Sequence, residues 1–391
     1  MRGLSRRDFG KKLSAGALSG LAASAATPLA RAQGEVNSPK SSPKRMTTAL
    51  RDLLQGPGII DCPSIYDPLS AKIAESVGFR YIELGGNARG IVTCQIGSAM
   101  SLDDLARTTR YITQVIDIPL LVDADARRAG DERRPVEAAV EVSVRGHGRV
   151  GQHARAATRH REGEHVPPVH GEPAEPPAVR VLEHAGAAGV FIDDQLFPKR
   201  FHYYMDGRVE TIPYQEMIEK IRYAVQARRD RDFIIGVRTD AISTHGFAEG
   251  VHRANLYLQA GADYVTLLPR TAEETKQIPK EVPGPLNYVN GEPGLAKRPD
   301  FTARELGTMG WKMLSHPASA ILIYYKTMKD AFARLKESGS LEMDPAVYGP
   351  VYKEVYQTMD ITTYYDIEYW TSRLGSRGAP GTFDPSFKAK E

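Results

Sequence analysis

The chain has 391 residues, of which 41% are hydrophobic and 25% are charged, so it can bury the core of one large domain or of two modest ones. Its 51 Lys and Arg residues nearly balance its 48 Asp and Glu residues, which argues against a nucleic-acid groove and against a cationic membrane surface. The two cysteines, Cys62 and Cys94, are too few for a disulfide framework and show no metal-ligand spacing. We expect both to be structural or incidental.

The N-terminal residues have the pattern of an export signal. The pair Arg6-Arg7 precedes a mildly apolar run over residues 13–29, and small residues follow it. This resembles a twin-arginine signal peptide over residues 1–32, followed by a polar linker over residues 33–49. A chance basic segment and an uncleaved anchor are the alternatives, although the run is marginal for a bilayer span. We expect no stable membrane anchor, and a periplasmic or secreted protein.

From residue 50 onward, short apolar runs alternate with amphipathic stretches. Eight strands, most of them followed by a helix, are typical of a (β/α)8 TIM barrel, an α/β fold that we predict over residues 50–335. The predicted strands cover 58–61, 81–84, 119–125, 189–194, 233–238, 264–268, 285–289 and 312–316. Between them, helical patterns cover 67–78, 101–115, 214–228, 247–261 and 271–278.

Three further helical patterns follow the eighth strand, at residues 318–338, 345–359 and 362–375. They are rich in aromatic residues, and they exceed what a lone barrel needs. We therefore predict a C-terminal helical extension over residues 336–391, and we expect part of this helical surface to cover a neighbouring subunit.

Charged side chains gather where the third, fourth and fifth strands end. In a barrel of this kind, residues at the carboxyl ends of the strands face the active site. Carboxylates gathered at one mouth repel each other unless protons or a divalent cation neutralise them, and oxygen ligands suit Mg²⁺ or Mn²⁺. The alternative role, capping of helix N-termini, would fit any one of these acids. The residues are Asp123, Asp125, Asp193, Asp194, Arg238 and Asp240.

Six segments in order resemble the isocitrate lyase/phosphoenolpyruvate mutase superfamily. They run from about Leu50 to Lys326, interrupted in the middle. The resemblance implies a (β/α)8 barrel whose eighth helix is commonly swapped between the subunits of a dimer or tetramer. It also implies cleavage or rearrangement of bonds next to the carbonyl group of small 2-oxo or 2-hydroxy acids. The segments are "YDPLSAKIAESVGFRYIELGG", "IPLLVDAD", "AGAAGVFIDDQLFPKR", "IIGVRTDA", "YLQAGADYV" and "EVPGPLNYV".

The resemblance implies a role for specific residues of this chain. Asp123 and Asp125 would hold Mg²⁺ or Mn²⁺ directly or through water, with Asp193 where the family usually has Glu. The function implied is a metal-dependent carbon–carbon lyase or decarboxylase that acts on a small (di)carboxylic acid through a metal-stabilised enolate.

The implied substrate site is carried by the second and fifth strands. Arg238 would bind the substrate carboxylate, and Gly85 and Gly86 lie where many members have a Ser-Gly pair that contacts the substrate through backbone N–H groups. Tyr66 and Asn87 are further substrate-binding candidates.

Several positions depart from the family pattern. After Lys199, a candidate catalytic residue, the lyases carry a Cys where this chain has Phe201, and a phenyl ring cannot transfer a proton. His202 could substitute for the thiol, or it is a surface histidine. Gln95 and Leu268 stand where acidic or polar residues are expected. We therefore expect oxaloacetate-type decarboxylation to exceed isocitrate cleavage. The alternatives are an impaired barrel that only binds carboxylates or oligomerises, and a phosphonopyruvate-type mutase or hydrolase.

Residues 126–181 have an atypical composition. They include no Leu, Ile, Met, Phe, Tyr, Trp, Lys, Asn or Cys, and they are rich in residues with GC-rich codons. We interpret them as a stretch read in the wrong frame, with a disordered insertion as the alternative. The wide spacing of their histidines argues against a zinc site. These histidines are His147, His153, His160, His165 and His170.

Overall fold

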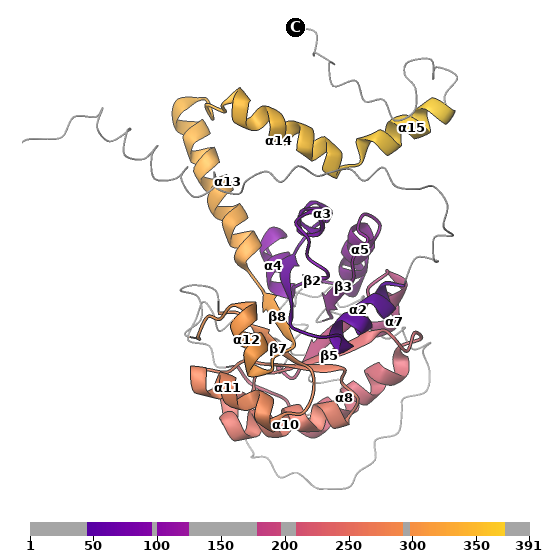
Figure 1. The fold of residues 1–391 in the computed structure, drawn as a ribbon, viewed down its shortest axis with the longest axis vertical. Coiled ribbons are helices and arrows are strands. Elements are labelled where there is room, and N and C mark those ends of the chain that lie inside the picture. Colours follow the sequence, from indigo (N-terminus) through magenta and orange to yellow (C-terminus); the bar gives the residue numbers. More distant parts are fainter. Residues whose placement is uncertain (1–44, 96–99, 125–177, 197–208, 292–297, 372–391) are drawn as a thin grey trace, which may run out of the picture. The chain divides into compact units, whose positions relative to one another are not determined.

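The computed structural model describes residues 45–95, 100–124, 178–196, 209–291 and 298–371. Contacts divide the chain into two compact units, Met1–Pro43 and Lys44–Glu391, and the first lies outside the described residues. In the second unit, eight parallel strands close into a barrel in sequence order, with the eighth strand paired to the first (Figure 1). The predicted (β/α)8 fold is confirmed.

Each predicted strand has a counterpart in the barrel. The strands are β1 (Ile60–Ile65), β2 (Ile82–Leu84), β3 (Leu120–Asp123), β4 (Gly189–Asp193), β5 (Ile234–Thr239), β6 (Tyr264–Leu267), β7 (Leu286–Val289) and β8 (Met313–His316). The helices around them are α3 (Pro68–Ser76), α4 (Gly86–Val92), α5 (Leu102–Thr113), α7 (Ala178–His184), α8 (Tyr214–Ala227), α9 (Ala241–His245), α10 (Phe247–Gln259), α11 (Ala272–Glu281) and α12 (Ala303–Met309).

The helices pack on the barrel through apolar stripes. In α5, Leu105, Thr109 and Ile112 recur at helical spacing and are buried, and the Ser101 side chain caps the helix by accepting from the N–H of Asp104. One apolar cluster joins α3, α5 and α7 to β2–β4. A second cluster joins β5–β8 to α8, α10, α11 and α12, and α8, α10 and α11 run along the lower side of the barrel in Figure 1.

A helix closes the N-terminal end of the barrel. This helix, α2 (Met46–Gln55), begins inside the segment predicted as a linker, so the end of that linker at residue 49 was wrong. Leu50 and Leu54 of α2 are buried against side chains of the barrel interior. Arg51 donates to the carbonyl of Phe233, just before β5, and to Asp263, just before β6. The barrel therefore has an apolar floor at the end opposite the expected active site.

The atypical segment ends earlier than its composition indicated. α7 begins at Ala178, and Val179 is buried in the apolar cluster around β3 and β4. Residues 178–181 are therefore part of the barrel, and the boundary at residue 181 was wrong. Residues 126–177, with their histidines, lie outside the described residues.

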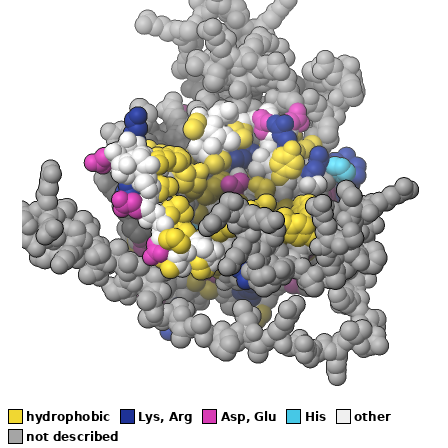
Figure 2. Space-filling view, turned by 90° about the horizontal axis from the view of Figure 1, so that it is seen from above, with side chains coloured by type: hydrophobic (Ala, Val, Ile, Leu, Met, Phe, Trp, Pro, Cys, Tyr) yellow, Lys and Arg dark blue, Asp and Glu magenta, His cyan; other side chains and the backbone are white. Residues whose placement is uncertain are grey.

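Three helices follow the barrel: α13 (Ser319–Ser338), α14 (Pro345–Thr358) and α15 (Ile361–Thr371). The start of α13 packs on the barrel, where Ile321 is buried against Ala88 of α4. No residue of α14 is buried. None of the described helices combines the length and the apolar content that a membrane span requires. Figure 2 shows hydrophobic side chains gathered on the described surface that faces the viewer, with acidic and basic side chains among them.

Candidate active site

The acidic and basic candidates meet at the carboxyl ends of neighbouring strands. Asp123 is the last residue of β3, and Asp193 is the last residue of β4. Asp193 pairs directly with Arg238 in the β4–β5 register, and Asp123 pairs with Phe191, two residues before Asp193. The sequence therefore located the charged end of β3–β5 correctly.

Asp123 is bound by the backbone at the start of α4. The N–H of Gly86 donates to Oδ2 of Asp123 at 3.1 Å. A Cβ atom at Gly86 would lie 2.6 Å from that oxygen, so any side chain there would displace the carboxylate. The Gly86 N–H group, which the resemblance assigned to the substrate, is directed at Asp123 in this structure. Gly85 is buried beside it.

Asp193 is buried and fixes the chain that follows β4. Its Oδ1 accepts a hydrogen bond from the N–H of Gln195 at 3.1 Å. The Gln195 side chain in turn donates to Oδ2 of Asp240 at 2.8 Å. The end of β4 is thereby tied to the end of β5.

Arg238 is held by a carboxylate on its own strand end. Its Nη2 donates to Oδ1 of Asp240 at 2.9 Å, and 20% of the Arg238 side-chain surface is exposed to solvent. Asp240 is fully buried, so this ion pair is screened less by solvent than a surface pair. The pair orients a guanidinium group, the preferred partner for a carboxylate, at the mouth of the barrel.

Asp194 organises the buried side of the same region. Its Oδ2 accepts from Thr239 at 2.7 Å, from Tyr257 at 3.0 Å and from Arg253 at 3.1 Å. Its Oδ1 accepts from the N–H of Asp240 at 3.1 Å. Burial raises the pKa of Asp194, and these hydrogen bonds oppose the rise. The sequence placed Asp194 at the strand end but did not reveal that its contacts lead into α10.

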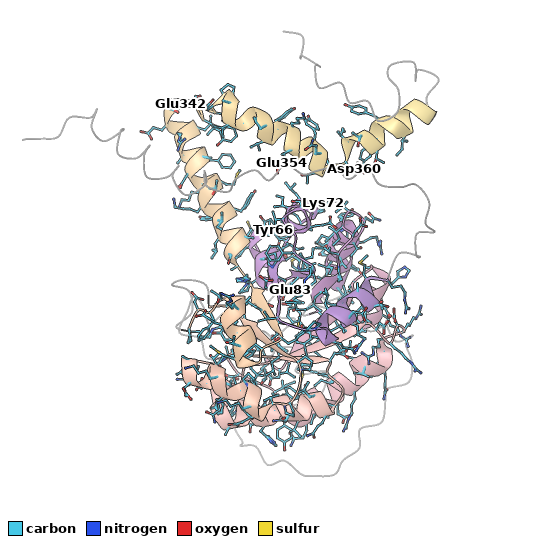
Figure 3. The ribbon with its side chains drawn as sticks, in the orientation of Figure 1. Tyr66, Lys72, Glu83, Glu342, Glu354 and Asp360 are labelled. Atoms are coloured by element: carbon cyan, nitrogen blue, oxygen red, sulfur yellow. The ribbon has the colours of Figure 1, made fainter. Side chains whose placement is uncertain are left out.

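A ring of buried polar side chains, absent from the predicted site, lies inside the barrel. Ser64 of β1 and Glu83 of β2 are register partners, and the Ser64 hydroxyl lies 3.4 Å from Oε1 of Glu83. Ser315 of β8 donates to Oε2 of Glu83 at 3.0 Å. Asn287 of β7 donates to Ser315 and to Thr266 of β6, both at 3.1 Å. Figure 3 labels Glu83 at the barrel, below Tyr66. We call these five residues the polar ring.

Glu83 is the titratable member of the polar ring. Burial raises its pKa to about 7, and the negative charge of Asp123 adds to the rise. The Ser315 hydrogen bond and the positive charge of Arg238 act in the opposite direction. No described Lys, Arg or His lies within ion-pair distance of Glu83. The signal that could have revealed it was an acid inside the otherwise apolar strand "YIEL".

The remaining described candidates lie around this mouth. Tyr66 follows β1 and packs its ring 6.0 Å from the ring of Tyr324 on α13. Asn87 is half-buried in the first turn of α4. Leu268, at the end of β6, is buried, so an apolar side chain does occupy that strand end. Cys62 is buried and burial raises its pKa, which makes it a poor nucleophile.

Four candidates lie outside the described residues. They are the metal candidate Asp125, the catalytic candidates Lys199 and His202, and Phe201 between the last two. Their roles stay predictions from the sequence.

The chemistry of the described carboxylates fits Mg²⁺. The described residues include no group of three or more His, Cys, Asp or Glu placed to hold one metal ion. Mg²⁺, however, is usually bound through one or two carboxylates, with water and substrate oxygens as its other ligands. Asp123 and Asp193 supply two such carboxylates on adjacent strands. Their oxygens are hard ligands of the kind that Mg²⁺ and Mn²⁺ prefer.

Comparison with known proteins agrees with this geometry. The phosphoenolpyruvate phosphomutase family model matches residues 170–336. The 2-methylisocitrate lyase of Aeropyrum pernix is 30% identical over 299 residues, which cover 76% of this chain and 82% of the relative. The 2,3-dimethylmalate lyase of Eubacterium barkeri is 27% identical over 299 residues, which cover 74% and 87%.

Solved structures show the same fold. A crystal structure of 2,3-dimethylmalate lyase superposes with a TM-score of 0.65 at 23% identity and covers 86% of this chain and 99% of its own. A phosphonopyruvate hydrolase in complex with oxalate and Mg²⁺ superposes with a TM-score of 0.61 at 23% identity, covering 83% and 98%. The chain belongs to the phosphoenolpyruvate mutase/isocitrate lyase superfamily. Its curated relatives place it among the lyases of that superfamily.

Proposed function

We propose that this enzyme is a Mg²⁺-dependent carbon–carbon lyase or decarboxylase that acts on a small 2-oxo or 2-hydroxy (di)carboxylic acid. The observation that carries the proposal is the placement of Asp123, Asp193 and Arg238 at one end of three consecutive strands. Two carboxylates and one guanidinium at one mouth match an acid bound together with a divalent cation.

Different side chains would bind the cation and the substrate. Asp123 and Asp193 would hold Mg²⁺, with Asp125 as a third ligand. Arg238 would bind a substrate carboxylate through two N–H groups, and Asp240 keeps the guanidinium oriented for it. When bound, Mg²⁺ would supply positive charge next to the substrate oxygens on which negative charge develops. The Asp194 contacts hold the backbone of Asp240, and so keep Arg238 in place.

Turnover assays test this function. Oxaloacetate and methylisocitrate would be offered to the enzyme with Mg²⁺ and with EDTA, and the Arg238→Lys variant would serve as the probe of carboxylate binding. We expect Mg²⁺-dependent turnover in which Arg238→Lys raises KM more than it lowers kcat, because Lys cannot make the bidentate contact. Magnesium binding without turnover of either acid would favour the impaired barrel. Turnover of phosphonopyruvate in their place would favour the mutase or hydrolase alternative.

The residue at position 201 decides which carbon–carbon bond is cleaved. Phe201 cannot act as a proton donor, and general acid–base catalysis is typically worth about 10²–10⁴-fold in rate. We therefore expect decarboxylation of oxaloacetate to exceed isocitrate cleavage, and Phe201→Cys to raise the cleavage activity. Rapid isocitrate or methylisocitrate cleavage by the unmodified enzyme would overturn this assignment.

We also propose that the enzyme is a dimer or tetramer built through its C-terminal helices. Monomeric proteins rarely leave a large apolar surface exposed. In α13–α15 the exposed apolar side chains recur along every helix. They include Ile323, Tyr324, Tyr325, Phe332, Leu335, Val347, Tyr348, Val351, Tyr352, Val355, Tyr364, Tyr365 and Ile367.

The proposed cellular location is the periplasm or the outside of the cell, reached by twin-arginine export. The support is the Arg6-Arg7 pattern, which lies outside the described residues. Cell fractionation of the native chain and of a variant with both arginines changed to lysine tests it. We expect the variant to stay in the cytoplasm, and equal export of both proteins would reject the signal.

A further inference from the structure

We propose that the polar ring binds a hydroxyl group of the substrate. The enzyme therefore prefers an acid that carries a hydroxyl group on the carbon beyond its metal-binding end. The same acid with a methyl group on that carbon binds less tightly. This inference rests on the proposed function, because it places that acid above the ring. It assigns Glu83 and Asn287 as residues that determine specificity.

The polar ring is a hydrogen-bonded chain of side chains from β6, β7, β8, β1 and β2, and it lies between two different environments. Below it, the interior is apolar, formed by residues such as Tyr81, Leu121 and Met313 together with α2. The thiol of Cys62, at that boundary, lies 3.9 Å from the Ser315 hydroxyl. Above it stand the charged strand ends. A buried polar layer in a barrel costs folding free energy compared with an apolar one, and side chains retained at such a cost are typical of functional sites.

The polar ring lies within reach of the mouth. A Cβ atom at Gly85 would lie 2.7 Å from the Ser64 hydroxyl and 3.6 Å from Oε1 of Glu83, so the backbone at the start of α4 rests directly on the ring. The next residue, Gly86, donates to Asp123. Glu83 also keeps 7% of its surface exposed, against 2% for Ser64. It is therefore the ring member best placed to meet a ligand.

The hydrogen-bond geometry of the ring suits a hydroxyl group. The Ser315 oxygen lies 3.0 Å from Oε2 of Glu83 and 3.2 Å from Oδ1 of Asn287, but its single proton can serve one of these acceptors. A substrate hydroxyl can donate to the acceptor that remains, and it can also accept. A methyl group can neither donate nor accept a hydrogen bond. It would exclude water from the Glu83 carboxyl group without replacing the lost hydrogen bond. With the pKa of Glu83 raised by burial to about 7, its carboxyl group can act as donor or acceptor near neutral pH.

This preference would distinguish the chain from relatives whose names specify methyl groups. Those relatives include a 2-methylisocitrate lyase and a 2,3-dimethylmalate lyase. A site built to hydrogen-bond a hydroxyl rejects the analogue that lacks it far more strongly than an apolar pocket rejects an extra methyl. The polar ring should therefore act against a methyl-bearing acid.

A set of matched diacids tests the inference. Malate, 3-methylmalate and the stereoisomers of tartrate share a four-carbon skeleton and carry hydrogen, methyl or hydroxyl at the second inner carbon. Oxalate serves as the anchor, because it has no group to reach the ring. Dissociation constants would be measured by calorimetry with Mg²⁺, using the full chain and its Glu83→Leu, Glu83→Gln and Asn287→Leu variants. Glu219→Gln, on the exposed face of α8, is the control variant.

We expect at least one tartrate isomer to bind the native enzyme about 10- to 100-fold more tightly than 3-methylmalate. Glu83→Leu and Asn287→Leu should each reduce that ratio about tenfold or more, and Glu83→Gln should reduce it less. Oxalate should bind all forms alike, which also shows that the variants are folded. An unchanged ratio in Glu83→Leu, or a native preference for 3-methylmalate, would overturn the inference alone. Failure of oxalate and all the diacids to bind with Mg²⁺ would instead overturn the proposed function on which it rests.

Discussion

Asp194 joins three elements through one carboxylate. It directly follows β4, accepts from the N–H of Asp240 after β5, and accepts from Arg253 and Tyr257 of α10. Arg253 also donates to the carbonyl of Ile212 and is nearly fully buried. A buried ion pair is weak evidence of stability by itself, but loss of one partner leaves a buried charge without compensation.

Asp194→Asn should therefore destabilise the fold. We expect a loss of about 3 kcal/mol in the free energy of unfolding, at the low end for a broken buried pair, because Glu249 still contacts Arg253. Urea unfolding measures it. Tyr257→Phe, which removes one hydrogen bond, is the matched control and should cost about 1 kcal/mol. Equal stability of Asp194→Asn and the native protein would show that the network is not structural.

Glu83 should make stability depend on pH. Below its ordinary pKa of 4.5 the carboxyl is protonated in both states, so it carries no penalty there. As pH rises from 4.5 to about 7, the unfolded chain releases the proton while the folded chain keeps it, and folding loses up to about 3 kcal/mol. Unfolding in EDTA between pH 4 and 8 should show that Glu83→Gln gains stability over the native chain as pH rises. A constant difference across this range would mean that folding does not raise the pKa of Glu83.

The strands of the barrel were predicted from the sequence, but the polar side chains inside it were not. All eight strands were found because parallel strands buried on both faces form apolar runs. The charged ends of β3–β5 followed from the same pattern, since acids come directly after buried runs. The polar ring was missed because one Glu, Thr, Asn or Ser inside a short strand looks like a surface position until the barrel brings the strands together.

The helix α2 was missed for a related reason. Its apolar residues, Leu50 and Leu54, stand one turn apart after a polar segment, and they have no visible partner until the barrel floor forms. The start of α7 was missed for the same reason. It follows the atypical stretch, and composition alone does not show which residue is the first to be buried against the barrel.

Leu50→Ala tests the importance of the α2 floor. Leu50 is buried among side chains of several strands, so its truncation leaves a cavity and should cost about 2–5 kcal/mol in the free energy of unfolding. Because the floor lies opposite the mouth, KM should change little. Val77→Ala, which truncates an exposed side chain at the end of α3, should change stability by less than about 0.5 kcal/mol. A Leu50→Ala protein as stable as the native one would mean that α2 is dispensable.

At the scale of the whole molecule, the barrel has an apolar floor, a polar ring and a charged mouth, and its C-terminal helices expose an apolar surface. The first three features concern a single chain. The apolar surface of the C-terminal helices concerns association, because no residue of α14 is buried within its own chain. Stability and oligomeric state should therefore respond to different substitutions.

Charged substitutions on α14 should separate the subunits without unfolding the chain. Val351 and Val355 stand four residues apart and are exposed, so Val351→Asp with Val355→Asp places two charges where we expect an interface. Analytical ultracentrifugation should find a dimer or tetramer for the native protein and a smaller species for this variant. Tyr223→Asp, on the exposed face of α8, is the control and should leave the mass unchanged. A native monomer at micromolar concentration would contradict the proposed assembly.

Calorimetric titration of Mg²⁺ in the presence of oxalate tests the proposed cation site at the mouth of the barrel. The native protein should bind one equivalent of Mg²⁺ per chain, Asp125→Ala should abolish binding, and Asp123→Asn and Asp193→Asn should each weaken it at least tenfold. Asp232→Asn, at the opposite end of the barrel beside α2, should bind as the native protein does. Native-like Mg²⁺ affinity in Asp123→Asn and Asp193→Asn, or no Mg²⁺ binding by the native protein, would show that these carboxylates do not form a cation site.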